Sequence, residues 1–188
     1  MTLFATEPPL GEPLTLAEAK AHLRLETDAE DALVASLIAA ARGHLEAVTG
    51  LVLTSQAFRL LLDDWPADGV IRIERFPVQA IDGVTVYDAD GVPAAVGFDG
   101  AALDGRARPA RLILADTPRP GAVLNGIEID LTAGFGTAAD VPPELRRALL
   151  LHVAHMYEFR GAVSPDMQPA GLPHGYHTLV APWTRRRL

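Results

Sequence analysis

The chain has 188 residues, of which 49% are apolar and 21% are charged, and its formal net charge is −8. This length suits one domain, or one domain that carries an insertion. An acidic chain is a poor candidate for tight nucleic-acid binding, because phosphate contacts need clustered cations. The sequence has no cysteine, which excludes disulfides, thiolate catalysis and Cys-ligated metal sites.

Residues 1–13 have no basic region followed by an apolar run, and they contain Glu7 and Glu12. We therefore expect no secretory signal peptide. No uninterrupted run approaches the roughly 18 apolar residues of a membrane helix, so we expect no membrane partner. The chain is expected to be made in the cytoplasm as a soluble protein.

Two helices are predicted in the first fifty residues. Thr15 and Glu18 have the spacing of a capping box, which begins a short helix that ends near Leu25. Asp28 is expected to cap a longer helix, and Gly50 is expected to end it in the left-handed conformation. Apolar residues recur at helical spacing along this second helix, at Leu33, Leu37, Ile38, Ala41, Leu45 and Val48.

From Leu51 onward the apolar period changes from 3.6 to 2. Six or seven short strands are predicted, including segments 58–62, 71–73, 84–86, 111–114 and 127–131. Turn signals at 88–91, 99–100 and 104–105 separate them. Connections this short favour antiparallel pairing, because parallel strands need long crossovers.

A third helix is predicted to start at the Pro142–Pro143 pair and to end at Gly161. The predicted fold class is α+β: a helical core of two N-terminal helices and one C-terminal helix, an inserted antiparallel β module, and an extended C-terminal tail. The corresponding boundaries are 1–50, 51–139, 140–161 and 162–188.

The third helix places His152, His155 and Glu158 on one face, at i, i+3 and i+6. Such a face could hold a metal ion, but the HExxH arrangement of zinc proteases is absent, and two histidines at this spacing often occur without a ligand. The sequence also lacks a P-loop and a GxSxG elbow. We therefore predict no catalytic residues, no metal and no cofactor.

The last 27 residues contain four prolines and large apolar side chains, followed by consecutive arginines. This segment carries a net charge of +2, which leaves −10 for the rest of the chain. One interpretation is a disordered end; the other is a tail that docks on a neighbouring protein, with aromatic anchors and arginines that pair with carboxylates. The candidate docking residues are Tyr176, Leu179, Val180, Pro182, Trp183, Arg185, Arg186 and Arg187.

Four segments in this order resemble the head–tail connector, or adaptor, proteins of long-tailed bacteriophages and gene transfer agents. They are Leu14–Lys20 with Leu23–Leu25, Leu37–Arg42 with Glu46 and Thr49–Gly50, Val141–Ala148 with His152–Glu158, and Leu179–Trp183. The resemblance covers the helices and the tail well and the β module loosely, because small family members are nearly all helix.

The resemblance implies a structural protein without catalytic residues. Family members form a ring, typically of twelve copies, beneath the portal of the capsid and above a tail-junction (stopper) protein, and DNA passes through the bore. On this basis the tail is expected to bind the portal, and the protein is expected in a virion or phage-like particle.

Two alternatives from other classes stay open at the sequence level. One is a metal-dependent hydrolase that uses His152, His155 and Glu158. The other is a free-standing adaptor domain that binds peptides and uses the tail as a regulatory segment.

Overall fold

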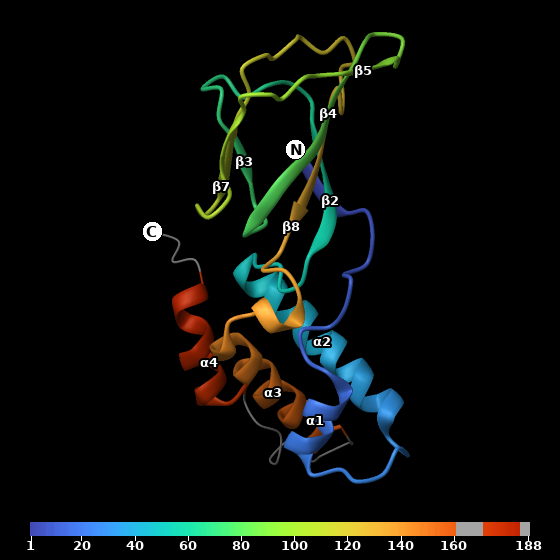
Figure 1. The fold of residues 1–188 in the computed structure, drawn as a ribbon, viewed down its shortest axis with the longest axis vertical. Coiled ribbons are helices and arrows are strands. Elements are labelled where there is room, and N and C mark those ends of the chain that lie inside the picture. The colour runs from blue at the N-terminus through green and yellow to red at the C-terminus, as the bar shows by residue number, and fades with distance from the viewer. Residues whose placement is uncertain (161–170, 185–188) are drawn as a thin grey trace. The chain divides into compact units, whose positions relative to one another are not determined.

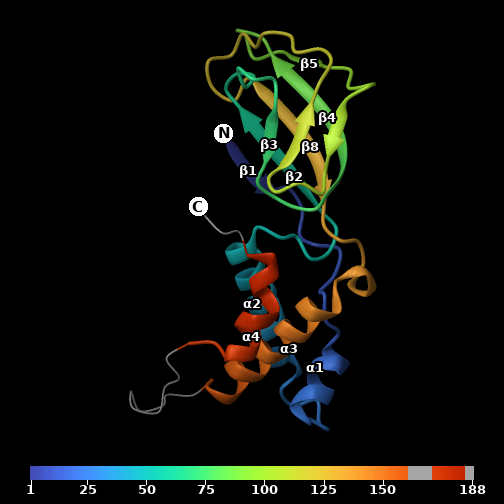
Figure 2. The ribbon, with the colours of Figure 1, turned by 90° about the vertical axis from the view of Figure 1, so that its left-hand side faces the viewer.

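A computed structural model describes residues 1–160 and 171–184, and within them the chain forms two compact units (Figures 1 and 2). The β unit consists of residues 1–10 and 54–135, and the helical unit consists of residues 11–53 and the chain from Gly136 onward. The architecture is mixed α and β with antiparallel sheets, which confirms the predicted fold class.

The β unit contains eight strands in two antiparallel sheets. One sheet has the order β1-β2-β8-β4-β5 and the other has the order β3-β7-β6. The strands are β1 (Thr2–Ala5), β2 (Gln56–Leu62), β3 (Ile71–Ile73), β4 (Val78–Tyr87), β5 (Pro93–Ala95), β6 (Ala102–Asp104), β7 (Ala110–Ile113) and β8 (Ile127–Ala133).

Alternation along the strands builds the core of this unit. Every second residue of β2 and β8 is buried, as in Leu60 and Ile129, which are register partners. Ile73 and Leu112 are buried on the smaller sheet. Three of the intervening residues of the larger sheet are charged, and Arg59 pairs with both Glu128 and Asp130. The unit is therefore a small sandwich with apolar inner faces.

β1 is a strand that the sequence pattern does not predict. It pairs antiparallel with β2, so that Leu3 lies opposite Leu60. Because its partner lies more than fifty residues away in sequence, no local turn signal connects the two strands. The N-terminal residues therefore belong to the β unit, whereas the sequence boundaries place them with the helices.

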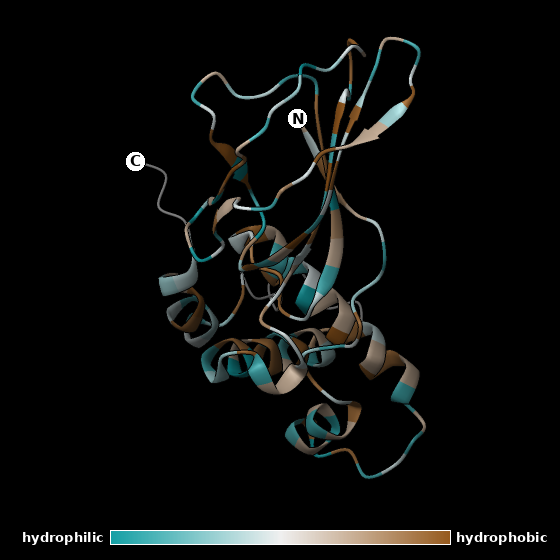
Figure 3. Ribbon diagram, turned by 45° about the horizontal axis from the view of Figure 1, so that its top comes forward, coloured by the Kyte–Doolittle hydropathy of each residue, from teal (hydrophilic) through white to brown (hydrophobic). Residues whose placement is uncertain are grey.

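The helical unit contains the 3₁₀ helices η1 (Ala138–Asp140) and η3 (Ala181–Trp183) and the helices α1 (Leu16–Leu23), α2 (Asp31–Thr49), α3 (Pro143–Glu158) and α4 (His174–Val180). Each of the longer helices carries both hydrophobic and hydrophilic residues (Figure 3). α2 and α3 pack through the buried residues Val34, Ile38, Leu45, Leu145 and Leu149, among others.

Helix ends follow the predicted chemistry in two places and depart from it in a third. Thr15 and Glu18 form both hydrogen bonds of the capping box, and Gly50 ends α2 at a φ of 74°. Asp28, however, does not cap α2. The N-cap is Glu30, and the Asp28 carboxylate lies 2.6 Å from Lys20 Nζ. An ion pair between Asp28, in the segment before α2, and Lys20 on α1 replaces the expected local cap.

By length and composition alone, α2 is long and apolar enough to cross a membrane. The search for uninterrupted apolar runs did not identify it. Its apolar residues Val34, Ile38, Ala41 and Leu45 are buried in the helical unit. The apolar face of α2 therefore forms part of the core of this unit.

The tail also differs from the sequence expectation. Residues 174–183 are helical and not extended, since α4 and then η3 occupy this segment. Pro173 precedes the first helical residue, and Tyr176 and Val180, four residues apart, are buried. Packing of these two side chains stabilises a helix too short to form alone.

Glu46 links α2 to the segment that follows it. Its Oε1 accepts a hydrogen bond from the buried Leu53 N–H at 2.9 Å, and its Oε2 lies 3.1 Å from Arg42, which also pairs with Glu12. We expect Glu46→Ala to lower the free energy of unfolding by about 1–3 kcal/mol, because a buried donor loses its acceptor. Urea denaturation measures this change.

The matched control is Glu46→Gln, whose side-chain carbonyl can still accept from Leu53 N–H. It should lose only the ion pair with Arg42 and cost about 1 kcal/mol or less. Equal losses for the two variants would contradict the assignment of the main effect to the Leu53 hydrogen bond.

Candidate functional site

The predicted docking residues fall into two groups around α4, which packs against α3. Tyr176 is only 2% exposed and Val180 is also buried, so both contribute to the core of the helical unit. Leu179 and Trp183 are half-buried, and Pro182 is exposed. Arg185, Arg186 and Arg187 lie outside the described residues.

Tyr176 lies beside two histidine rings from other helices. Its ring centroid lies 5.4 Å from that of His152 on α3 and 6.2 Å from that of His44 on α2. The two histidine rings meet edge to face, with centroids 5.0 Å apart. One aromatic side chain from α4 therefore contacts both long helices of the unit.

Two polar atoms in this cluster are buried without a partner among the residues that the structure describes: Tyr176 Oη and His152 Nδ1. Burial, followed by the neighbouring charges of His44 and His155, lowers the pKa of His152 to about 4. Burial also raises the pKa of Tyr176. Both of these side chains are therefore neutral near pH 7, and their rings meet in an aromatic contact.

The histidine face of α3 does not form a metal centre in the described part of the chain. The structure groups no three His, Asp or Glu side chains there that could hold a metal ion. His152 is buried beside Tyr176, whereas the His155 ring lies 5.1 Å from the ring of Phe159 and Glu158 is exposed. The three side chains proposed as ligands thus have different surroundings.

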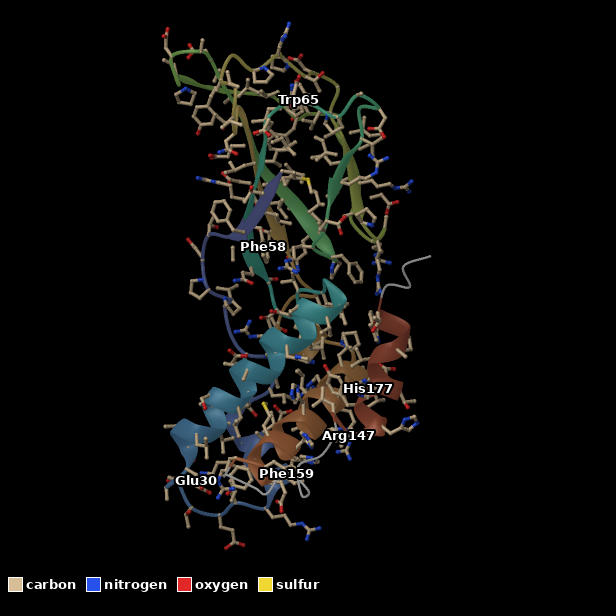
Figure 4. All side chains as sticks on the ribbon, turned by 180° about the vertical axis from the view of Figure 1, so that it is seen from behind. Glu30, Phe58, Trp65, Arg147, Phe159 and His177 are labelled. Carbon is tan, nitrogen blue, oxygen red and sulfur yellow. The ribbon has the colours of Figure 1, made fainter. Side chains whose placement is uncertain are left out.

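Charged side chains connect the helices of this unit. Arg146 on α3 pairs with Glu18 on α1, and Glu30 accepts from Tyr157 and lies 3.2 Å from Arg160. Arg147, by contrast, is exposed on α3. Figure 4 labels Glu30, Arg147 and His177 among the side chains of this unit. These ion pairs and the Tyr157 hydrogen bond therefore stabilise the packing of α1, α2 and α3 without any contribution from α4.

Sequence reasoning did not identify His44 as part of the α4 contact. His44 lies within a helix that already has an apolar stripe, and its contact with Tyr176 joins residues 132 positions apart. The spacing of Tyr176 and Val180 at i and i+4 after a proline is the signal that could have predicted a buried helical face in the tail.

The chain is similar to a protein family over part of its length and to solved structures over its whole length. The family of phage gp6-like head-tail connector proteins matches residues 13–91. A chain from the solved neck of an empty gene transfer agent particle, computed with C6 symmetry, is 31% identical, with a TM-score of 0.84; the match covers 100% of this chain and 97% of that one. No curated protein matches the chain significantly.

Two further solved structures give the same result. A chain of the virion of a native gene transfer agent particle has a TM-score of 0.83, and one from the native neck computed with C12 symmetry has a TM-score of 0.80, each at 31% identity and with the same coverage. Identity at this level over nearly the full length of both chains, with the family match, shows that the chain belongs to the phage gp6-like head-tail connector proteins.

Proposed function

We propose that this protein is a structural subunit of the head–tail junction of a phage-like particle, where it joins the capsid portal to a downstream tail-junction protein. The observation that carries the proposal is the 31% identity to neck chains over both units of the fold. A match confined to the helices would support only a shared helical domain. Because the β unit is included, the likeness extends to the whole subunit.

The proposed assembly is a ring, with twelve copies as the expected number. Support comes from the C12 symmetry with which one similar neck was computed. Twelve copies at −8 each give the ring a formal charge of about −96. Carboxylates repel DNA phosphates, so a ring of this charge suits a bore through which DNA passes without being held.

The proposed contact with the portal lies at the C-terminal end of the chain. Tyr176 and Val180 hold α4 against its own unit, so they position the segment that follows. Leu179, Pro182, Trp183 and the arginines from Arg185 to Arg187 are then the residues proposed to contact the portal. Arginine and tryptophan are the residue types that most often dominate the energy of such contacts.

Replacing Arg185, Arg186 and Arg187 together by alanine tests this contact. We expect the fraction of capsids that carry tails to fall by about tenfold, because three charged contacts are lost without any change to α4. Negative-stain electron microscopy of purified particles measures the fraction.

His174→Ala is the matched control, since His174 is an exposed residue of α4. This variant should leave tail attachment unchanged. A normal fraction of tailed particles in the triple variant would contradict the portal contact. Truncation after Gly161 is a poorer test, because it also removes the buried Tyr176 and Val180 from the helical unit.

A role without catalysis is part of this proposal. The different surroundings of His152, His155 and Glu158 support it, and metal analysis of the purified protein tests it. Tightly held zinc or manganese in near-stoichiometric amount would favour the hydrolase alternative. Portal, protease and capsid genes beside the gene for this chain would favour the particle over a free-standing peptide-binding adaptor.

A further inference from the structure

Three loops meet at one end of the β unit and expose apolar side chains there. The loops are residues 63–70 after β2, 88–92 between β4 and β5, and 115–126 before β8, and we call them the loop cluster (Figure 1). Val123 is 88% exposed, Leu124 is 72% exposed and Val92 is 57% exposed. Adjacent large apolar side chains this exposed are unusual for a surface that contacts only water.

Hydrogen bonds between the loops fix this surface. The Trp65 indole N–H donates to Pro118 O at 2.8 Å, Asn125 N–H donates to Asp63 Oδ1 at 2.8 Å, and Gly121 N–H donates to Tyr87 O at 2.9 Å. Figure 4 labels Trp65 at this end of the unit, far along the sandwich from Phe58. The bonds connect the third loop to the first loop and to the last residue of β4, so the apolar side chains are presented by an ordered scaffold.

Close backbone packing supports the same conclusion. A Cβ atom at Gly121 would lie 2.4 Å from Ala89 N, so only glycine allows the third loop to press against the turn between β4 and β5. Asn125 adopts a positive φ of 52°, which asparagine tolerates better than most residues. The loop is thus built to hold Val123 and Leu124 outward.

The rim of the cluster is acidic. Asp63, Asp64, Asp88, Asp90 and Asp116 lie on these loops, and Arg119 is the cation of the third loop. Among the described residues none of these five carboxylates forms an ion pair, although Asp63, Asp64 and Asp88 accept backbone hydrogen bonds. Their charge is therefore available to a partner.

These properties restrict what can cover the cluster. Nucleic acid is disfavoured, because its phosphates would meet carboxylates. Pairing with the same cluster of a second copy is disfavoured as well, since two acidic rims would repel each other. A complementary partner presents an apolar pocket surrounded by lysine or arginine side chains.

We propose that the loop cluster is a docking surface for a different protein of the particle, one whose contact site is an apolar pocket with a basic rim. Val123 and Leu124 enter the pocket, and the aspartates pair with the rim. The inference rests on the proposed function for the presence of this chain in a particle, but it concerns a surface separate from the C-terminal segment.

Photo-crosslinking in particles tests the proposal. One variant carries p-benzoylphenylalanine in place of Leu124. The matched control carries it in place of Leu10, which is 90% exposed in the same unit. The Leu10 N–H donates to Ser55 O, so Leu10 lies beside the start of β2, whereas the loop cluster follows the end of that strand. We expect position 124 to crosslink to another particle protein at a peptide that contains apolar and basic residues, and position 10 not to do so.

A substitution gives a second measurement. Val123→Asp combined with Leu124→Asp should lower the yield of tailed particles about tenfold. The two apolar side chains that enter the partner's pocket are lost, and carboxylates would have to be buried in that apolar pocket instead. Leu10→Asp should stay within about twofold of the parent chain. Unchanged thermal unfolding of both purified variants would show that folding is not the cause.

The outcomes separate this inference from the proposed function. If the chain is present in particles but position 124 crosslinks to nothing, to DNA or to another copy of the chain, the docking surface is wrong and the connector role stands. If the variant with Val123→Asp and Leu124→Asp supports a normal yield of tailed particles, the docking surface is likewise wrong. If the chain is absent from particles, the connector role fails and this inference fails with it.

Discussion

Replacing Tyr176 by alanine is expected to lower the free energy of unfolding of the helical unit by about 3–5 kcal/mol, the range found when a large buried aromatic side chain is truncated. Tyr176 is the side chain by which α4 contacts both His152 and His44. A helix of seven residues does not persist without such a contact. Chemical denaturation followed by far-UV circular dichroism measures the loss.

Tyr176→Phe is the control that separates the ring from its hydroxyl. Tyr176 Oη is buried without a partner in the described part of the chain, so removing it should leave the stability unchanged or raise it by about 1 kcal/mol. If phenylalanine destabilised the unit as strongly as alanine, the hydroxyl would have a bonding role and the aromatic packing would not be the main contribution.

The same two residues show how the packing of α4 affects attachment. If α4 positions the arginines that follow it, Tyr176→Ala should also reduce tail attachment, and Tyr176→Phe should not. His174→Ala, which alters an exposed side chain of the same helix, should match the parent chain in both measurements. The stability of the helical unit and the attachment of tails would then both depend on the buried ring of Tyr176.

Features that depend on local hydrogen bonds were predictable from the sequence. The capping box of Thr15 and Glu18, the left-handed Gly50 and the turn at Asp88–Gly91 each involve residues within a few positions of one another. The alternation of β2 and β8 was predictable for a similar reason, since each strand buries one face. These elements define the α+β fold class without any tertiary information.

Features that depend on distant partners were not predictable in this way. β1 is held by β2, Asp28 pairs with Lys20 instead of capping α2, and α4 is helical although Gly175 is a poor helix former. In each case a tertiary contact determines the local structure. For the candidate site, the sequence identified Tyr176 and Trp183 as important but did not indicate that Tyr176 is buried in its own chain.

The loop cluster illustrates the same limit. Val123 and Leu124 lie between Gly121 and Gly126 in a segment without strand or helix periodicity, so the sequence predicts only a loop there. Their exposure, and the bonds that fix the loops to one another, depend on contacts between segments up to about sixty residues apart. Residue type alone did not distinguish these two residues from core residues.

Acidification is expected to destabilise the helical unit through His152, which is 6% exposed. Burial, together with His44 and His155, holds its pKa near 4, below the ordinary value of 6.5. The unfolded chain therefore binds a proton first as the pH falls. The stability contributed by neutral His152 is fully present above pH 6.5 and decreases between pH 6.5 and 4, by about 3 kcal/mol in total. Urea denaturation at successive pH values measures this loss.

His152→Phe identifies the source of this pH dependence. Phenylalanine keeps an aromatic edge toward His44 and Tyr176, removes the unpartnered Nδ1 and cannot take up a proton. Carboxylates elsewhere in the chain titrate in both proteins, so the difference between the two stability curves isolates the histidine. We expect the difference to grow from pH 7 to pH 4, with a slope approaching about 1.4 kcal/mol per pH unit. Parallel curves would mean that His152 is not held neutral by burial, and that its contact with Tyr176 on α4 is open to water.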